Sequence, residues 1–180
     1  MKTYICLLRG INVSGKNIIK MDALKQMFES LGATNVKTYI QSGNVVFQYK
    51  DEKPVALETL ITSQILADFG FDVPVQVLSF EELKHIVENN PFLKDSTKDE
   101  AFLHLTFLAA PPQEIDQEVL FSKKTGNEEI VITDAAVYLY CPHGYGRTKL
   151  NNNFLENKLK VHATTRNWKT TLKLLEMAAS

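Results

Sequence analysis

The sequence predicts an α+β fold of two α/β-sandwich subdomains, the first ferredoxin-like (βαββαβ) and the second a related βαββ unit with extra C-terminal helices. Two observations lead to this prediction. Apolar runs of strand length alternate with segments whose apolar residues recur every three or four positions, and a second round of this alternation begins after residue 79. The composition of the 180 residues is 44% hydrophobic and 23% charged, which fits a globular protein and excludes collagen-like, coiled-coil and disordered classes.

Turn and cap residues divide the first half into six elements. Gly32 and Gly70 each follow a helical pattern, at the place where a left-handed residue ends a helix. Pro54 suits a first helical turn, and residues 41–43 suit a hairpin turn between two strands. We therefore expect, in order, a strand, a helix, two strands, a helix and a strand over residues 3–9, 21–31, 36–40, 44–49, 54–69 and 74–78.

A capping box marks the boundary between the halves. Ser79 with Glu82 three residues later begins a helix at about residue 80, so we place the domains at residues 1–79 and 80–180. After this helix, which ends before Asn89, we expect a strand, a short helix, two hairpin strands and two helices over residues 102–109, 113–121, 129–133, 136–141, 149–159 and 167–178. The halves have a similar element order but no repeat in sequence.

The N-terminal apolar run is too short for a signal peptide, and no stretch approaches the 18 apolar residues that span a bilayer. We therefore expect a cytoplasmic protein without a membrane partner. Cys6 and Cys141 lie in apolar strand-like runs, which predicts buried, inert thiols rather than a disulfide or a zinc site.

Charge is segregated along the chain although the net charge is only −1. Residues 80–141 carry a local charge of −7, and residues 142–170 carry +5. The simplest interpretation is two solvated faces. A second interpretation is an anion cradle, because Arg147 and Lys149 precede one expected helix and Arg166 and Asn167 open another, where the helix dipole favours an anion.

A second candidate cradle follows the first strand. Residues 9–17, with Arg9, Asn12 and Lys16, contain two cations, two glycines and short polar side chains. Gly10 to Asn17 matches the phosphate-binding P-loop pattern except at its last position, where Asn17 replaces Ser or Thr. The hairpin order that follows does not suit a parallel nucleotide-binding sheet, so we do not expect a P-loop.

No complete catalytic signature is present, so the sequence leaves enzymatic activity undecided and names no cofactor. The four histidines are scattered, without partners at metal-ligand spacing, and we expect no metal site. His143 lies in a Gly-containing loop beside cations, where it is either part of the turn or an acid or base.

Four segments together give the chain a family resemblance: LLRGINVSGKN at 7–17, TYIQSGNVVF at 38–47, YLYCPHGYGRTKL at 138–150 and ATTRNWKT at 163–170. In combination they resemble the bacterial domain of unknown function 1697 family. The resemblance spans nearly the whole chain and implies two α+β halves, the first ferredoxin-like. It implies no activity, substrate or catalytic residue.

The most recognisable of these segments are polar loops, where binding groups usually collect on a rigid scaffold. Our leading hypothesis is a binding protein for an anionic ligand, such as a nucleotide, a phosphorylated metabolite or a short nucleic acid, in a groove between the halves. The expected ligand-binding residues are Arg9, Asn12, Lys16, Gln41, Ser42, Asn44, Arg147, Lys149, Arg166 and Asn167. The alternatives are an enzyme acting on a phosphorylated or acyl substrate, and a protein-interaction module whose oligomeric state the sequence does not define.

Overall fold

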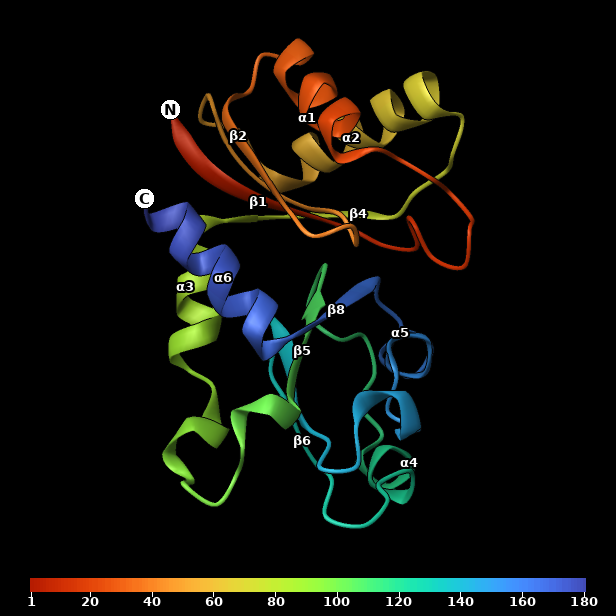
Figure 1. The fold of residues 1–180 in the computed structure, drawn as a ribbon. Helices are drawn as coiled ribbons and strands as arrows, with labels where there is room; N and C mark the ends of the chain where they lie inside the picture. The colour runs from red at the N-terminus through yellow and green to blue at the C-terminus, as the bar shows by residue number, and fades with distance from the viewer. The chain divides into compact units, whose positions relative to one another are not determined.

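The computed structural model describes residues 1–180, which form two compact units (Figure 1). Unit 1 comprises Met1–His85 together with Lys173–Ser180, and unit 2 comprises Ile86–Leu172. The division into domains at residues 1–79 and 80–180 stays a prediction. No helix combines the length and the apolar character needed to cross a membrane.

Unit 1 contains a four-stranded antiparallel sheet of order β2-β3-β1-β4. Its elements are β1 (Lys2–Leu8), α1 (Met21–Ser30), β2 (Thr34–Tyr39), β3 (Asn44–Tyr49), α2 (Pro54–Phe69) and β4 (Val75–Ser79). α3 (Phe80–Glu88) follows, and its last three residues belong to unit 2. Figure 1 shows α1 and α2 on one face of this sheet. The connection order and strand order are those of a ferredoxin-like unit, as the sequence predicts.

The core of unit 1 follows from strand alternation. Tyr4, Cys6 and Leu8 of β1 point to one face and pack with Val45 and Phe47 of β3. Apolar stripes from the two helices cover this face with Leu24, Phe28, Leu57, Ile61 and Ile65. The predicted burial of both cysteines is confirmed.

The predicted cap residues end α1 and begin α3 where expected. Gly32, at φ +93°, closes α1: its N–H donates to Glu29 O and the Ala33 N–H donates to Phe28 O, which together form a Schellman motif. At the start of α3, Glu82 N–H donates to Ser79 Oγ at 3.1 Å and Ser79 N–H donates to Glu82 Oε2 at 2.7 Å. This is the predicted capping box.

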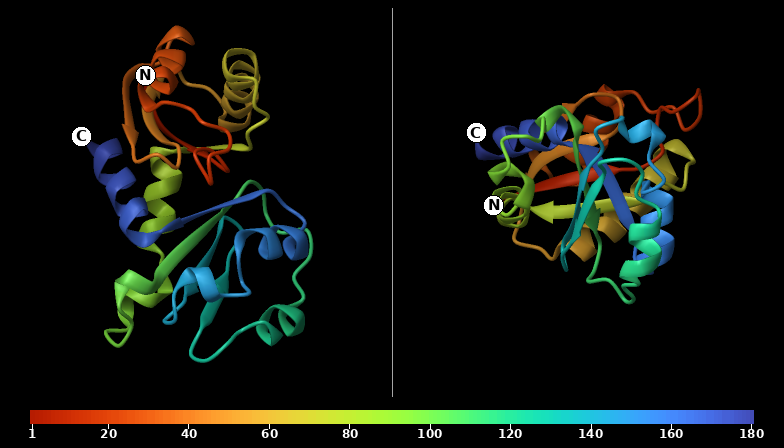
Figure 2. Two further views of the ribbon diagram at one scale, coloured as in Figure 1. Left: turned by 45° about the vertical axis from the view of Figure 1, so that its right-hand side comes forward. Right: turned by 90° about the horizontal axis from the view of Figure 1, so that it is seen from below.

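Unit 2 contains a second four-stranded antiparallel sheet, of order β6-β7-β5-β8. Its elements are β5 (Leu103–Leu108), α4 (Gln117–Ser122), β6 (Glu129–Ile132), β7 (Ala136–Tyr140), α5 (Asn152–Leu159) and β8 (Ala163–Asn167), with short 3₁₀ helices η1 (Pro91–Lys94), η2 (Glu100–Phe102) and η3 (Tyr145–Arg147). α6 (Trp168–Ala179) follows β8. Figure 2 shows the same chain from two further directions.

The predicted class of two α/β sandwiches is confirmed, and unit 2 contains one strand more than its predicted βαββ order. β8 lies where the sequence suggested only the approach to a helix. It is an edge strand that pairs with β5 alone, so it needs little apolar surface, and its sequence ATTRN has no apolar run. With β8 the connection order becomes βαββαβ, the same as in unit 1.

Two helices of unit 2 begin later than expected, at residues 117 and 152. In each case an Asp or Asn side chain sets the start, because Asp116 accepts from the Val119 N–H and Asn151 accepts from the Phe154 N–H.

Candidate anion-binding loops

Two polar loops lie side by side at one end of the sheet of unit 1, and we call them the double loop: residues 9–20 after β1 and residues 40–43 between β2 and β3. They are neighbours because β1 and β3 are paired antiparallel, with Leu7 opposite Asn44, so that the end of β1 lies beside the start of β3. Six of the ten expected binding residues are in the double loop or at its edge: Arg9, Asn12, Lys16, Gln41, Ser42 and Asn44.

Asn12 joins the two loops through its side chain. Its Nδ2 donates to Gln41 O at 2.8 Å and to Ile19 O at 3.0 Å, and its Oδ1 accepts from the Ile19 N–H at 2.9 Å. Asn12 therefore fixes the base of the first loop and ties the second loop to it.

The first loop is a small hairpin. Val13 and Lys16 form a β-bridge, with Lys16 N–H donating to Val13 O at 2.9 Å around Ser14 and Gly15. Both turn residues have positive φ, +50° and +72°, as a type I′ turn requires. Asn17 closes the base by donating from Nδ2 to Gly10 O at 3.0 Å.

This geometry differs from a P-loop. In a P-loop the backbone N–H groups surround a phosphate, and a helix follows directly. Here the residues between Gly10 and Asn17 form a hairpin, and α1 begins only at Met21. The phosphate-binding motif that the sequence nearly matches is therefore not formed.

The backbone of the double loop is unusual in its conformation. Four of the six non-glycine residues with positive φ lie here, namely Asn12, Ser14, Asn17 and Ile40. Ile40 is the least expected of them, because a β-branched side chain disfavours the left-handed region. Strained backbone of this kind clusters at functional sites, where the surrounding structure holds it in place.

The second loop is held by close packing and by Asn44. A Cβ on Gly43, which has φ +89°, would lie 2.7 Å from Leu8 Cβ and 2.8 Å from Ile11 Cδ1, so only glycine fits. Asn44 is buried and donates from Nδ2 to Tyr39 O and to Ser42 Oγ, both at 3.0 Å. Asn12 and Asn44 therefore hold the loops in shape, whereas the side chain of Gln41 is exposed.

The charge of the double loop is positive. Residues 9–20 contain Arg9, Lys16 and Lys20 and no acidic residue. Lys16 and Lys20 are exposed, and Arg9 is half-buried. Ser14 and Gly15 at the turn are also exposed, so a polar turn and cationic side chains occupy the same tip.

The remaining four expected residues are in unit 2, and of these only Asn167 lies at the start of an α-helix. Arg147 ends η3, five residues before α5, and Arg166 lies in β8 opposite Leu105. Asn167 lies opposite His104, so its side chain points to the other face of the sheet from Arg166, and its Oδ1 accepts from the Thr170 N–H as the cap of α6. Arg147 and Lys149 are exposed.

His143 lies beside a buried carboxylate in unit 2. Its imidazole packs against Gly126, where a Cβ would come within 2.8 Å of Nε2. Glu128 is 3% exposed, and its Oε1 accepts from the N–H and the hydroxyl of Thr125 at 2.8 and 2.9 Å. Burial alone raises the pKa of Glu128, but hydrogen bonds from Thr148 and Thr125 and the charge of His143 outweigh it, and the pKa is lowered.

The buried carboxylate of Glu128 also acts on Cys141. Burial and the charge of Glu128 raise the pKa of this thiol to about 11, so the thiol is protonated and not poised as a nucleophile. No group of three or more His, Cys, Asp or Glu side chains is arranged to hold a metal ion.

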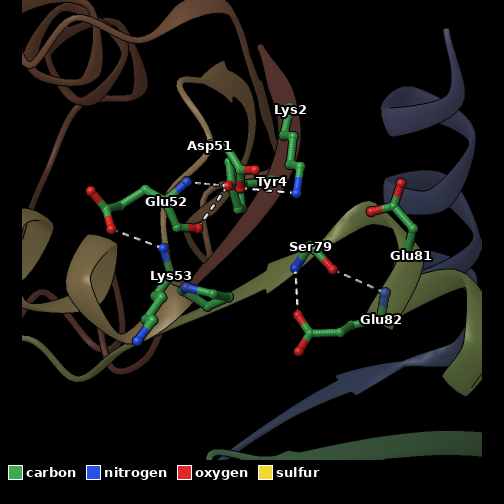
Figure 3. Close-up of a pocket in the computed structure, with 9 residues that line it drawn as sticks. Lys2, Tyr4, Asp51, Glu52, Lys53, Ser79, Glu81 and Glu82 are labelled. Atoms are coloured by element: carbon green, nitrogen blue, oxygen red, sulfur yellow. Dashed lines mark hydrogen bonds and ion pairs between the residues drawn. The ribbon is translucent and has the colours of Figure 1, made fainter.

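Unit 1 also contains a cavity of about 810 Å³ that was not predicted from the sequence (Figure 3). It forms where the start of β1, the segment after β3 and the start of α3 meet. Lys2 pairs with Asp51 at 2.9 Å, which raises the pKa of Lys2, and Tyr4 Oη donates to Glu52 O at 2.7 Å. Four carboxylates against two lysines line the cavity, so it repels an anion.

Two sheets with the same ferredoxin-like strand order define a tandem α+β protein. The family model described as "Protein of unknown function (DUF1697)" matches residues 1–138, and the chain belongs to this family, which confirms the resemblance. No curated protein matches the sequence. The solved structure of the conserved bacterial protein SP0830 from Streptococcus pneumoniae is similar, with 27% identity, a TM-score of 0.72 and coverage of 98% of each chain.

Proposed function

We propose that this protein binds an anionic ligand at the double loop of unit 1. The observation that carries the proposal is the combination of an acid-free loop bearing Arg9, Lys16 and Lys20 with a backbone held rigid by Asn12. A rigid, preorganised group of donors binds at a lower cost in conformational entropy than a mobile loop does. The free, buried state of both cysteines supports a reducing compartment such as the cytoplasm.

The ligand class that fits is a phosphate-bearing molecule, such as a nucleotide, a phosphorylated metabolite or a short nucleic acid. Lysine acts as a point charge toward phosphate, and exposed backbone N–H groups at a left-handed turn supply uncharged donors. The exposed side chains of Ser14 and Gln41 add neutral polar groups beside the cations.

The test is a thermal-shift screen at low salt against pyrophosphate, nucleotides, sugar phosphates and short RNA and DNA oligomers. A ligand at 100 times its dissociation constant adds about 2.7 kcal/mol to the free energy of unfolding, which is readily seen. Lys16→Ala and Lys20→Ala are expected to reduce the shift. Lys123→Ala removes an exposed lysine of unit 2 and serves as the matched control.

The salt dependence of binding distinguishes the ligand classes. A small phosphate gives a slope near one or two, and a nucleic acid with several phosphate contacts gives a steeper one. Equal shifts in the wild type and both double-loop variants contradict the proposal. A loss of the shift in Arg147→Ala alone would move the site to unit 2.

A further inference from the structure

The double loop carries exposed apolar side chains as well as cations. Val13 is 56% exposed, Ile18 55% and Ile40 49%, and these are three of the twelve large apolar side chains that the chain exposes. The double loop contains less than a tenth of the residues, so exposed apolar side chains are concentrated there. Because an aliphatic side chain offers a phosphate no hydrogen-bond donor, the proposed anion site alone does not explain them.

The three apolar side chains lie around one rigid point of unit 1. Each is the chain neighbour of a residue in the hydrogen-bond network of Asn12, whose side chain binds the backbone of Ile19 and Gln41 at 2.8–3.0 Å. Ile11 and Ile19, both 1% exposed, anchor the first loop in the core of unit 1. The double loop therefore has a fixed base, with part of its apolar surface buried and part in solvent.

Ile40 is exposed in spite of backbone strain. Its φ of +51° is a conformation that a β-branched side chain disfavours and that asparagine or glycine adopts more readily. An isoleucine that is both strained and half-exposed contributes little to the backbone or to the core. Residues that break a local rule in this way mark functional sites.

We propose that the double loop docks on the surface of an anionic lipid bilayer, an inference that rests on the proposed function because the lipid phosphates are then the anionic ligand. Val13, Ile18 and Ile40 enter the boundary between headgroups and acyl chains, and Lys16 and Lys20 face the phosphates. Neither loop contains an acidic residue, so the charge of the double loop is complementary to such a surface throughout.

The composition and shape of the double loop favour a lipid surface over a nucleic acid or a protein. Neither loop contains an aromatic residue, the type on which single-stranded bases stack and which is enriched at the centres of protein interfaces. Figure 1 shows the segment between β1 and α1 standing out from the sheet, and the right-hand view of Figure 2 shows the same. Such a tip offers little area to a rigid partner, whereas a fluid bilayer closes around it.

Docking of this kind needs no membrane-spanning segment. The sequence predicts no membrane partner because no apolar run is long enough to cross a bilayer. That argument does not apply to loops that enter only the headgroup boundary. Three aliphatic side chains and a few cations give weak, reversible binding, which we expect to be lost at high salt.

Sedimentation of the full chain with lipid vesicles tests the inference. We expect binding to vesicles of phosphatidylcholine mixed with phosphatidylglycerol and none to vesicles of phosphatidylcholine alone. Each buried methylene contributes about fourfold to partitioning, so Ile18→Ser with Ile40→Asn is expected to weaken binding by about tenfold or more. Ile115→Ser removes an isoleucine of unit 2 that is 48% exposed, and this matched control is expected to bind as the wild type does.

The double variant also separates lipid docking from damage to the fold or to the anion site. Asparagine suits the positive φ of residue 40, so the variant is expected to be at least as stable as the wild type. It keeps Lys16 and Lys20, so its thermal shift with pyrophosphate and nucleotides is expected to be unchanged. Lys16→Ala is expected to reduce both the thermal shift and vesicle binding, the latter by about fivefold.

The possible results distinguish this inference from the proposed function. Lipid docking is overturned, and the anion site stands, if the protein shows a thermal shift with soluble anions but binds no vesicles, or if the double variant binds vesicles as tightly as the wild type. Binding of a short RNA oligomer without binding of vesicles assigns the double loop to nucleic acid and also overturns lipid docking. The absence of both vesicle binding and a thermal shift with any anion overturns both proposals.

Discussion

Asn12→Ala tests the physical basis of the double loop. The substitution removes three hydrogen bonds of 2.8–3.0 Å, two to the backbone of Ile19 and one to Gln41 O. A typical hydrogen bond contributes about 0.5–1.5 kcal/mol net, and the exposed bond to Gln41 lies at the low end, so the three together contribute about 2 kcal/mol. Alanine at φ +54° adds about 1 kcal/mol of backbone strain. We expect a loss of about 3 kcal/mol.

A matched variant separates the two contributions. Asn12→Gly loses the same hydrogen bonds but accepts the positive φ without strain. It is therefore expected to be destabilised by about 1 kcal/mol less than Asn12→Ala. Asn12→Asp keeps an acceptor for the Ile19 N–H and loses both donated bonds. Its free energy of unfolding is therefore expected to lie between those of the wild type and Asn12→Ala.

Urea denaturation followed by circular dichroism gives the free energies, and hydrogen exchange by mass spectrometry locates the effect. The amides of residues 9–20 and 40–44 are expected to exchange faster in Asn12→Ala, with unit 2 unchanged. An Asn12→Ala protein with wild-type stability and wild-type exchange in both loops would refute the view that this side chain holds the loops together.

Three further results are expected. Gly43→Ala should destabilise unit 1 by about 2–4 kcal/mol in urea denaturation, because the new Cβ overlaps Leu8 and Ile11 at positive φ, and a stable variant would contradict the packing. The lowered pKa of Glu128 contributes stability that is present above its unfolded pKa and lost as the pH falls below it. The stability of Glu128→Gln should therefore decline less steeply below about pH 5 than that of the wild type, as measured by the melting temperature against pH. An identical decline in both proteins would exclude this contribution of Glu128. Cys6 and Cys141 should be unreactive toward a thiol reagent in the native protein, so rapid labelling without denaturant would show that the strands open.

Elements with local signals could be predicted from the sequence, and elements that depend on distant contacts could not. Gly32 and the Ser79–Glu82 capping box ended and began helices where expected, because each acts through neighbours within a turn. β8 was not predicted because its sequence, ATTRN, contains no apolar run. An edge strand pairs with only one neighbour and does not need such a run. The grouping of Lys173–Ser180 with unit 1 also depends on contacts far along the chain.

The candidate site shows the same division. The polar composition of residues 9–17 and 41–43 identified the loops, and the pairing of β1 with β3 brings them together. The sequence did not reveal which side chains are exposed and which hold the backbone: Lys16 and Gln41 are exposed, whereas Asn12 and Asn44 form hydrogen bonds within the loops. The cavity beside Lys2 was missed because its lining comes from three separate segments. The one motif among them, the Ser79–Glu82 capping box, indicates the start of a helix and not a cavity.

The most direct test of anion binding at the double loop is a titration of the ¹⁵N-labelled protein with pyrophosphate and with a nucleotide, followed by amide chemical shifts. We expect saturable shifts at the amides of Ser14, Gly15 and Lys16 and of residues 40–43, reduced in Lys16→Ala and abolished by high salt. Saturable shifts confined to unit 2, or no saturable shift at low salt with any of these anions, would contradict it.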